Sequence, residues 1–168
     1  MLNLTVIELG SGTGFCGLVA WLLGSNRVIL TDEFVDLCSV NMERAKLQFP
    51  DISTDLCCRE VEWGNRDHSA SIIREIPDTV DVIIASEITP MISTHAALVS
   101  TIRDFNPKRL ILTLDMKENS ASGELSLGKS AREFLSALGA SDYDIIVPLT
   151  TSNLLVPIAI ADIRLRAN

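Results

Sequence analysis

The sequence lacks the features of a membrane, secreted or zinc-binding protein. No apolar run reaches the roughly 20 residues that cross a membrane, and no basic segment precedes an apolar stretch near Met1. The four cysteines form no C-x-x-C pair, which argues against a zinc ribbon and a disulfide framework. We therefore expect reduced thiols, no metal site and no membrane contact. The expected location is the cytoplasm, with the nucleus as a second location.

Basic residues are scarce relative to acidic ones. The chain has 14 Lys and Arg residues against 22 Asp and Glu residues, a formal net charge of -8. Proteins hold nucleic acid largely through basic side chains that displace counterions, so this balance argues against nucleic acid as a partner. It favours a protein partner that presents a basic site. The sequence is silent on the oligomeric state.

Apolar runs that alternate with helix-like segments indicate the fold class. Strands are expected at residues 4–9, 27–31, 55–61, 80–85, 109–114 and 143–147, and a last apolar run at 154–163 is divided by Pro157. Helices are expected at residues 14–23, 36–49, 72–76, 94–104 and 129–138, with a polar turn at 65–71 and a long surface loop at 115–128.

This alternation predicts one α/β domain over residues 1–168. The expected architecture is a Rossmann-like, doubly wound three-layer sandwich with a mostly parallel seven-strand sheet. The last two strands are too close in sequence for a helix to lie between them. We therefore expect an antiparallel strand at that edge of the sheet.

A glycine-rich loop follows the first predicted strand. Residues Glu8-Leu9-Gly10-Ser11-Gly12-Thr13-Gly14 place an acid and three alternating glycines between a strand and a helix. Glycine has no Cβ to obstruct a sharp turn against a ligand, and the free N–H groups of the helix start favour polar ligand groups. The loop therefore predicts a site for a nucleotide-type ligand.

Further polar and aromatic residues follow the next three strands. Asp32 lies 18 residues after Gly14, near the spacing at which an acid accepts hydrogen bonds from ribose hydroxyls. Trp63 follows the third strand and Ser86-Glu87 the fourth. Because the carboxyl ends of parallel strands share one edge, these residues should converge. Two cofactors fit the pattern, S-adenosylmethionine and a nicotinamide dinucleotide, because residues 12–17 also match G-x-G-x-x-G.

About the first ninety residues resemble a known family. The blocks VIELGSGTGFCGL, LTD, VEWG and DVIIASE occur in order at natural spacing. They resemble class I (seven-strand) S-adenosylmethionine-dependent methyltransferases, and more narrowly the protein-lysine methyltransferase group called methyltransferase family 16. The resemblance implies N-methylation of a protein lysine side chain, with S-adenosyl-L-homocysteine as the product of the cofactor.

The resemblance also implies roles for individual residues. The implied cofactor-binding residues are Glu8, Gly10, Ser11, Gly12, Thr13, Gly14, Asp32, Glu33, Trp63 and Ser86. Within this set, Glu8 would hold the methionine end of the cofactor and the loop, and Asp32 would bind the ribose. Trp63 would pack at the adenine or form part of the pocket wall. Glu87 would be the catalytic residue that accepts the proton or the developing charge of the amine.

Two departures from the family pattern leave alternatives open. The family motif D/E-x-x-Y reads Glu87-Ile88-Thr89-Pro90 here, so the acid is kept and the aromatic residue is not. Family members also carry amino-terminal elements that cover the cofactor, and we expect these lid elements to be missing. A catalytically inactive methyltransferase-fold binding module or complex subunit is therefore the second hypothesis. A nicotinamide-dependent reductase is the third.

Other residues that often carry chemistry are expected to be structural. His68 and His95 occur singly in polar or helix-start contexts, which predicts surface histidines. Cys57 and Cys58 are adjacent on a predicted strand, so their side chains should point to opposite faces and pack there.

Overall fold

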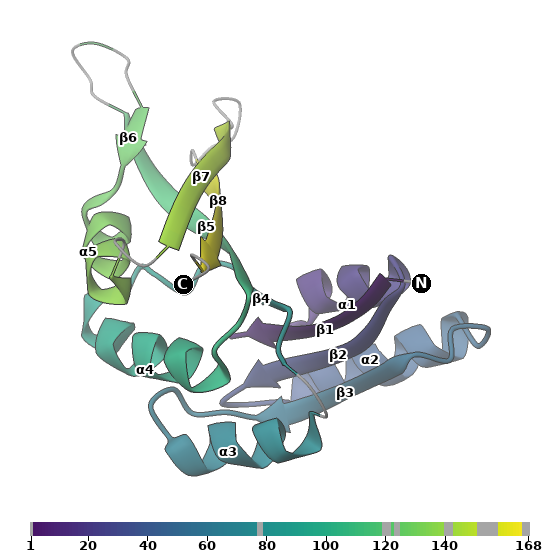
Figure 1. The fold of residues 1–168 in the computed structure, drawn as a ribbon. Coiled ribbons are helices and arrows are strands. Elements are labelled where there is room, and N and C mark those ends of the chain that lie inside the picture. Colours follow the sequence, from purple (N-terminus) through teal and green to yellow (C-terminus); the bar gives the residue numbers. More distant parts are fainter. Residues whose placement is uncertain are drawn as a thin grey trace.

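The protein is described by a computed structural model that covers residues 2–76, 79–118, 122, 125–139, 143–150 and 158–165 (Figure 1). Its strands are β1 (Leu2–Leu9), β2 (Ser25–Asp32), β3 (Asp55–Glu60), β4 (Val82–Ala85), β5 (Arg109–Glu118), β6 (Leu125–Leu127), β7 (Tyr143–Thr150) and β8 (Ile158–Leu165). Its helices are α1 (Phe15–Leu22), α2 (Asp36–Gln48), α3 (Arg66–Glu75), α4 (His95–Phe105) and α5 (Lys129–Leu138), with a 3₁₀ turn, η1 (Ile92–Thr94), before α4.

One mixed sheet organises these elements. The strand order is β3-β2-β1-β4-β5-β8-β7, and β6 pairs with the far end of β5. Strands β3, β2, β1, β4 and β5 run parallel to one another, whereas β8 runs antiparallel to both β5 and β7. The predicted doubly wound sheet with an antiparallel edge is therefore confirmed. The reversed strand is β8, one position inside the outermost strand β7.

Helices cover both faces of the sheet, as the sequence predicts. Figure 1 shows α1 and α2 on one side of β1–β3 and α3 on the other. Successive side chains of a strand point to opposite faces of the sheet. Val6 therefore packs in the cluster with α1 and α2, and Ile7 packs in the cluster with α3, α4 and α5. Burial on both faces explains why the central strands read as continuous apolar runs.

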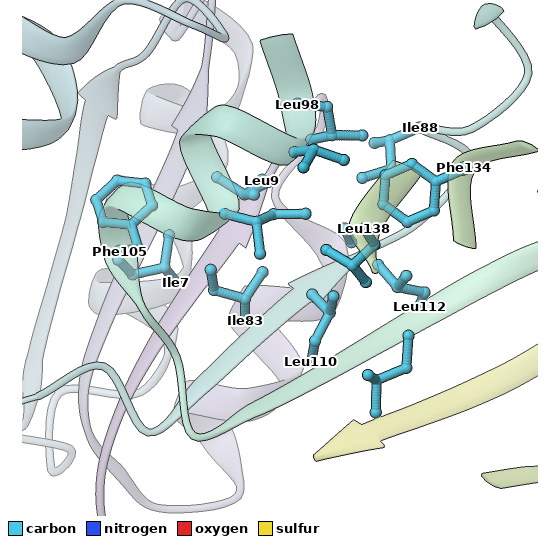
Figure 2. Packing of buried hydrophobic residues seen from close by; sticks show 14 of the residues in the cluster. Ile7, Leu9, Ile83, Ile88, Leu98, Phe105, Leu110, Leu112, Phe134 and Leu138 are labelled. Atoms are coloured by element: carbon cyan, nitrogen blue, oxygen red, sulfur yellow. The ribbon is translucent and has the colours of Figure 1, made fainter. Parts of the chain in front are cut away.

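The larger core cluster lies between β1, β4, β5 and the helices α4 and α5. Figure 2 shows Ile7 and Ile83 of the sheet facing Leu98 and Phe105 of α4. Phe134 of α5 closes the same cluster and is fully buried. Burying each such side chain contributes roughly 1.5–3 kcal/mol. This packing fixes α4, and therefore the loop that connects β4 to α4.

The expected polar turn at residues 65–71 is wrong, because α3 begins at Arg66. The side chain of Asn65 caps this helix by accepting hydrogen bonds from the backbone N–H groups of Asp67 (3.2 Å) and His68 (3.4 Å). Asparagine favours both turns and helix starts. The polar first turn of the helix therefore has the composition of a loop.

The long loop expected at residues 115–128 is also wrong. Strand β5 continues to Glu118, and β6 pairs with it in antiparallel register, with Met116 opposite Leu127. Both of these side chains pack against the larger core cluster, which favours pairing over a free loop. The last apolar run, residues 154–163, is expected to be divided by Pro157. Its second half forms β8, and residues 154–157 lie outside the described residues.

The cysteine prediction is confirmed, since Cys57 packs against the larger cluster and Cys58 against the smaller one. In the described part of the chain, no helix is both long enough and apolar enough to span a membrane.

Candidate active site

The loop after β1 turns through three glycines with left-handed backbone. The φ values of Gly10, Gly12 and Gly14 are 63°, 51° and 81°. A methyl group on Gly10 would lie 2.9 Å from Ile88 Cγ2 and 3.2 Å from Trp63 Cζ2, so only glycine fits there. A methyl group on Gly12 would have no heavy atom within 4 Å. Gly12 therefore leaves open space where a ligand can approach the backbone.

Glu8 supports this loop from below. Its side chain is buried, and Oε2 accepts a hydrogen bond of 2.9 Å from the backbone N–H of Gly17 in the first turn of α1. Burial raises the pKa of Glu8 to about 7, against the lowering effect of hydrogen bonds from Gly17 and Cys16. The carboxyl group therefore links β1 to α1 and fixes where the loop begins.

Asp32 holds the loop from its other side. Its Oδ2 accepts a hydrogen bond of 2.8 Å from the Gly12 N–H, and its Oδ1 accepts one of 3.2 Å from the Phe34 N–H. A carboxylate can accept about four hydrogen bonds, so Asp32 retains capacity for ligand hydroxyl groups. The end of β2 thus positions a half-buried acid next to the open space at Gly12.

The remaining loop residues have structural partners of their own. The backbone N–H of Ser11 donates to Thr31 O at 2.9 Å, and the exposed Thr13 accepts from Asn41 Nδ2 through its carbonyl at 2.9 Å. The Ser11 hydroxyl is buried and has no hydrogen-bond partner among the described residues. Such a hydroxyl is most stable when a water molecule or a ligand atom binds it.

The chain leaves β4 through an unusual backbone conformation. Glu87 has a φ of 59°, which costs a residue with a Cβ about 1–2 kcal/mol. The Glu87 N–H donates to Thr113 Oγ1 of β5 at 3.0 Å, and Ser86 Oγ lies 3.1 Å from the same atom. These contacts stabilise the turn that carries the exposed Glu87 side chain.

An open cleft of about 550 Å³ lies where these strand ends meet. Six predicted residues line it: Gly10, Asp32, Glu33, Trp63, Ser86 and Glu87. Its volume lies in the range of sites that bind cofactors and small molecules. Residues from four separate strand ends therefore meet in one site, as expected for a ligand at the carboxyl edge of a parallel sheet.

A family model described as lysine methyltransferase matches residues 1–136. The chain belongs to this family. Protein N-lysine methyltransferase METTL21A of Mus musculus is 31% identical over 98 residues, which are 58% of this chain and 42% of that protein. The chain thus matches less than half the length of this relative.

Solved methyltransferase structures share the fold of this lysine methyltransferase family member. Magnesium protoporphyrin IX methyltransferase (ChlM) from Synechocystis PCC 6803, with bound SAH, has a TM-score of 0.70 at 15% identity, over 98% of this chain and 74% of that chain. The glycopeptide N-methyltransferase MtfA, complexed with S-adenosyl-L-homocysteine, has a TM-score of 0.66 at 10% identity, over 99% of this chain and 83% of that chain. The fold is therefore that of class I methyltransferases.

Five predicted residues of this family member lie beside the cleft without lining it: Glu8, Ser11, Gly12, Thr13 and Gly14. Glu8 and Gly14 lie on the α1 and α2 side of the sheet, where a Cβ on Gly14 would lie 2.9 Å from Leu30 Cδ1. They shape the loop, and Gly12 contacts the cleft residue Asp32. Family membership favours the methyltransferase interpretation of this loop over the nicotinamide-dependent reductase.

The remaining cleft-lining residues are not among the predicted site residues: Val61, Glu62, Ile88, Pro90, Met91, Thr94 and Ala97. Most of them lie between β4 and α4, and their positions depend on the left-handed turn at Glu87. The sequence has no local signal for these residues, because the packing of Gly10 against Ile88 joins positions far apart in the chain.

The prediction of a surface His95 is wrong. Its side chain is buried at the start of α4, with Nε2 2.9 Å from the Thr89 carbonyl and its ring edge against Phe134. Ser130 of α5 also donates to the Thr89 carbonyl. The reason is that α5 packs over the amino end of α4 and encloses the histidine. His95 and Ser130 therefore anchor the loop that forms one wall of the cleft.

The second histidine, His68, is half-buried, and its Nδ1 accepts a hydrogen bond of 3.2 Å from the Glu62 N–H. In the described segments, no group of three or more His, Cys, Asp or Glu side chains could hold a metal ion.

Proposed function

We propose that this protein transfers a methyl group from S-adenosylmethionine to the side-chain nitrogen of a lysine in another protein. The observation that carries the proposal is the cleft at the ends of β1 to β4 in a chain of the lysine methyltransferase family. Two solved structures of the same fold, with bound SAH, support the choice of cofactor.

The residues of the cleft fit such a cofactor. The open space at Gly12 admits a ligand against the backbone, and the carboxylate of Asp32 can accept hydrogen bonds from ribose hydroxyls. The ring of Trp63 offers an apolar wall for a base, and the Ser11 hydroxyl, which has no partner among the described residues, lies in the adjoining loop. When bound, S-adenosylmethionine supplies an electrophilic methyl group on a sulfonium.

Glu87 is the residue that acts on the acceptor. A lysine amine attacks only when it is neutral, so an acid near the nitrogen helps by orienting it and by accepting its proton or developing positive charge. Glu87 is exposed, lines the cleft and is held at the end of β4. Ser86 precedes it and lines the same wall.

A protein with a basic site is the partner that this cleft favours. Glu33, Glu62 and Glu87 are exposed carboxylates around it, in a chain of net charge -8. These charges attract a cationic side chain and disfavour nucleic acid. The mouse relative, a protein N-lysine methyltransferase, supports the same acceptor.

Two measurements test the proposal. Isothermal titration with S-adenosyl-L-homocysteine should give one site, and its absence with folded protein would reject the cofactor. Incubation with methyl-tritiated S-adenosylmethionine and a cell protein extract, followed by acid hydrolysis, should release label as N-methyllysine. Label in methylarginine or methylhistidine instead would reject the lysine acceptor.

A second candidate is an inactive binding module that keeps the cofactor site. The observation that favours it is Pro90, which lines the cleft where the family motif has an aromatic residue. Proline cannot donate a hydrogen bond to the acceptor nitrogen or stack on it as tyrosine would. Binding of S-adenosyl-L-homocysteine without any methyl incorporation would favour this candidate.

The cytoplasm, with the nucleus as a second location, is likewise proposed from sequence composition alone. Fluorescence microscopy of a tagged chain tests this location, and a signal confined to another compartment would reject it.

A further inference from the structure

We propose that Thr113 is a positioning residue, which holds Glu87 in the conformation that presents its carboxylate to the cleft. This inference rests on the proposed function, because it concerns the residue that acts on the acceptor amine. It is carried by the hydrogen bond of 3.0 Å from the Glu87 N–H to Thr113 Oγ1. The left-handed backbone of Glu87 is the second observation.

The Glu87 backbone needs a partner because its conformation is unfavourable. A φ of 59° brings the Cβ of an L-residue close to its own carbonyl oxygen, so such a residue persists only when its surroundings hold it. Glycine would adopt this turn without strain, but glycine has no carboxylate. The site therefore combines a strained backbone with a side chain that the proposed reaction needs.

Thr113 is firmly placed for this task. It lies in β5, one residue after the last pair between β4 and β5, Ala85 with Leu112. On its other side β5 pairs with β8, where Thr113 lies opposite Ile160. The neighbouring side chains of Leu112 and Leu114 are buried in the larger core cluster. The Thr113 hydroxyl is thus carried by a strand that pairs on both sides and has buried neighbours.

The hydroxyl of Thr113 has the donor and acceptor groups that this turn requires. One lone pair accepts the Glu87 N–H, and Thr113 Oγ1 is also 3.1 Å from the Ser86 hydroxyl. A hydroxyl offers one donor and two acceptor positions, so both contacts can form together. Valine has the same shape but can neither donate nor accept a hydrogen bond. The single oxygen Oγ1 of Thr113 therefore contacts two consecutive residues of the cleft wall, Ser86 and Glu87.

The test compares Thr113→Val and Thr113→Ser with a matched control, Thr54→Val. Thr54 is half-buried just before β3, and its hydroxyl has no hydrogen-bond partner among the described residues. The same chemical change there should leave every readout unchanged. The first readout is amide hydrogen exchange of Glu87 by NMR. The second is methyl transfer to the cell extract at varied S-adenosylmethionine.

Thr113→Val should accelerate Glu87 amide exchange at least tenfold and lower the maximal transfer rate at least tenfold. The affinity for S-adenosyl-L-homocysteine and the KM for S-adenosylmethionine should stay within threefold of wild type. Thr113→Ser keeps the hydroxyl and should retain wild-type exchange and at least a third of the rate. If Thr113→Val does not fold, Thr113→Ala removes the same hydroxyl without crowding the site.

Wild-type exchange at Glu87 in the Val or Ala variant would overturn the inference. A Ser variant that loses as much rate as the Val variant would overturn it too, as would a tenfold loss of S-adenosyl-L-homocysteine affinity in Thr113→Val. If the wild-type protein binds no S-adenosyl-L-homocysteine and transfers no methyl group, the proposed function fails, and the exchange measurement still decides whether Thr113 holds Glu87.

Discussion

The Glu8 carboxyl group accepts a hydrogen bond of 2.9 Å from the backbone N–H of Gly17 and does not line the cleft. A residue that the family resemblance assigns to the cofactor therefore also joins β1 to the first turn of α1. Its burial has a measurable consequence for the pH dependence of folding.

Stability should fall with rising pH because of Glu8. Its pKa in the folded protein is about 7 against an ordinary value of 4.5, since burial disfavours the charged form. Stability from this group is therefore fully present below pH 4.5 and is lost as the pH rises to about 7. The total is about 3 kcal/mol at 1.36 kcal/mol per pH unit. Urea unfolding of wild type and Glu8→Gln at pH 4.5 and pH 8 measures this contribution as the difference between the two proteins. An identical pH response of both proteins would contradict the prediction.

Alanine substitutions at Gly10 and Gly12 should have different main effects: the first on the stability of the fold, the second on the binding of the cofactor. Both substitutions introduce a Cβ at positive φ, but only the one at Gly10 would approach Ile88, at 2.9 Å. Gly10→Ala should therefore lose about 2–4 kcal/mol of unfolding free energy and Gly12→Ala about 1 kcal/mol. Gly12→Ala should instead weaken S-adenosyl-L-homocysteine binding, because its methyl group enters the open space. Thermal unfolding and isothermal titration check the pair, and equal stability losses would contradict it.

Removal of the Asp32 carboxylate should weaken the cofactor. Asp32→Ala leaves the Gly12 N–H and the ribose hydroxyls without their acceptor, at a cost of about 1–3 kcal/mol in affinity. The matched control is Asp36→Ala, which removes an exposed acid in the first turn of α2. Titration with S-adenosyl-L-homocysteine should distinguish the two variants. Unchanged affinity in Asp32→Ala would remove this residue from the site.

Helix α3 should depend on its cap. Asn65→Ala removes the oxygen that accepts hydrogen bonds from Asp67 N and His68 N, at a cost of about 0.5–2 kcal/mol. Asn65→Asp keeps that acceptor and should retain wild-type stability. Chemical denaturation of the three proteins gives the comparison, and an Asp variant as unstable as the Ala variant would argue against the cap.

The central strands and the glycine loop could be predicted from the sequence because their signals are local. Continuous apolar runs such as residues 80–85 are typical of strands buried on both faces, and their carboxyl ends must meet at one edge. Asp32, Trp63 and Glu87 follow three of these strands, and all three line the cleft.

The failures arose where contacts between distant residues decide the outcome. The three-residue strand β6 forms because Leu127 finds Met116, and His95 is buried because α5 covers it. Met91 and Thr94 reach the cleft only through the turn at Glu87, which Thr113 stabilises from another strand. No local sequence pattern indicates which distant residues will come into contact.

The place of β1 in the sheet also bears on synthesis. Val6 pairs with Val28 of β2 on one side and with Val82 of β4 on the other, so its two neighbours leave the ribosome far apart in time. Until β4 emerges, the second edge of β1 carries unpaired N–H and C=O groups beside strongly apolar side chains. Such edges recruit strands from other chains. The nascent protein is therefore most prone to aggregation in the interval between these two strands, and a chaperone that covers this edge would protect the chain until β4 completes the cleft.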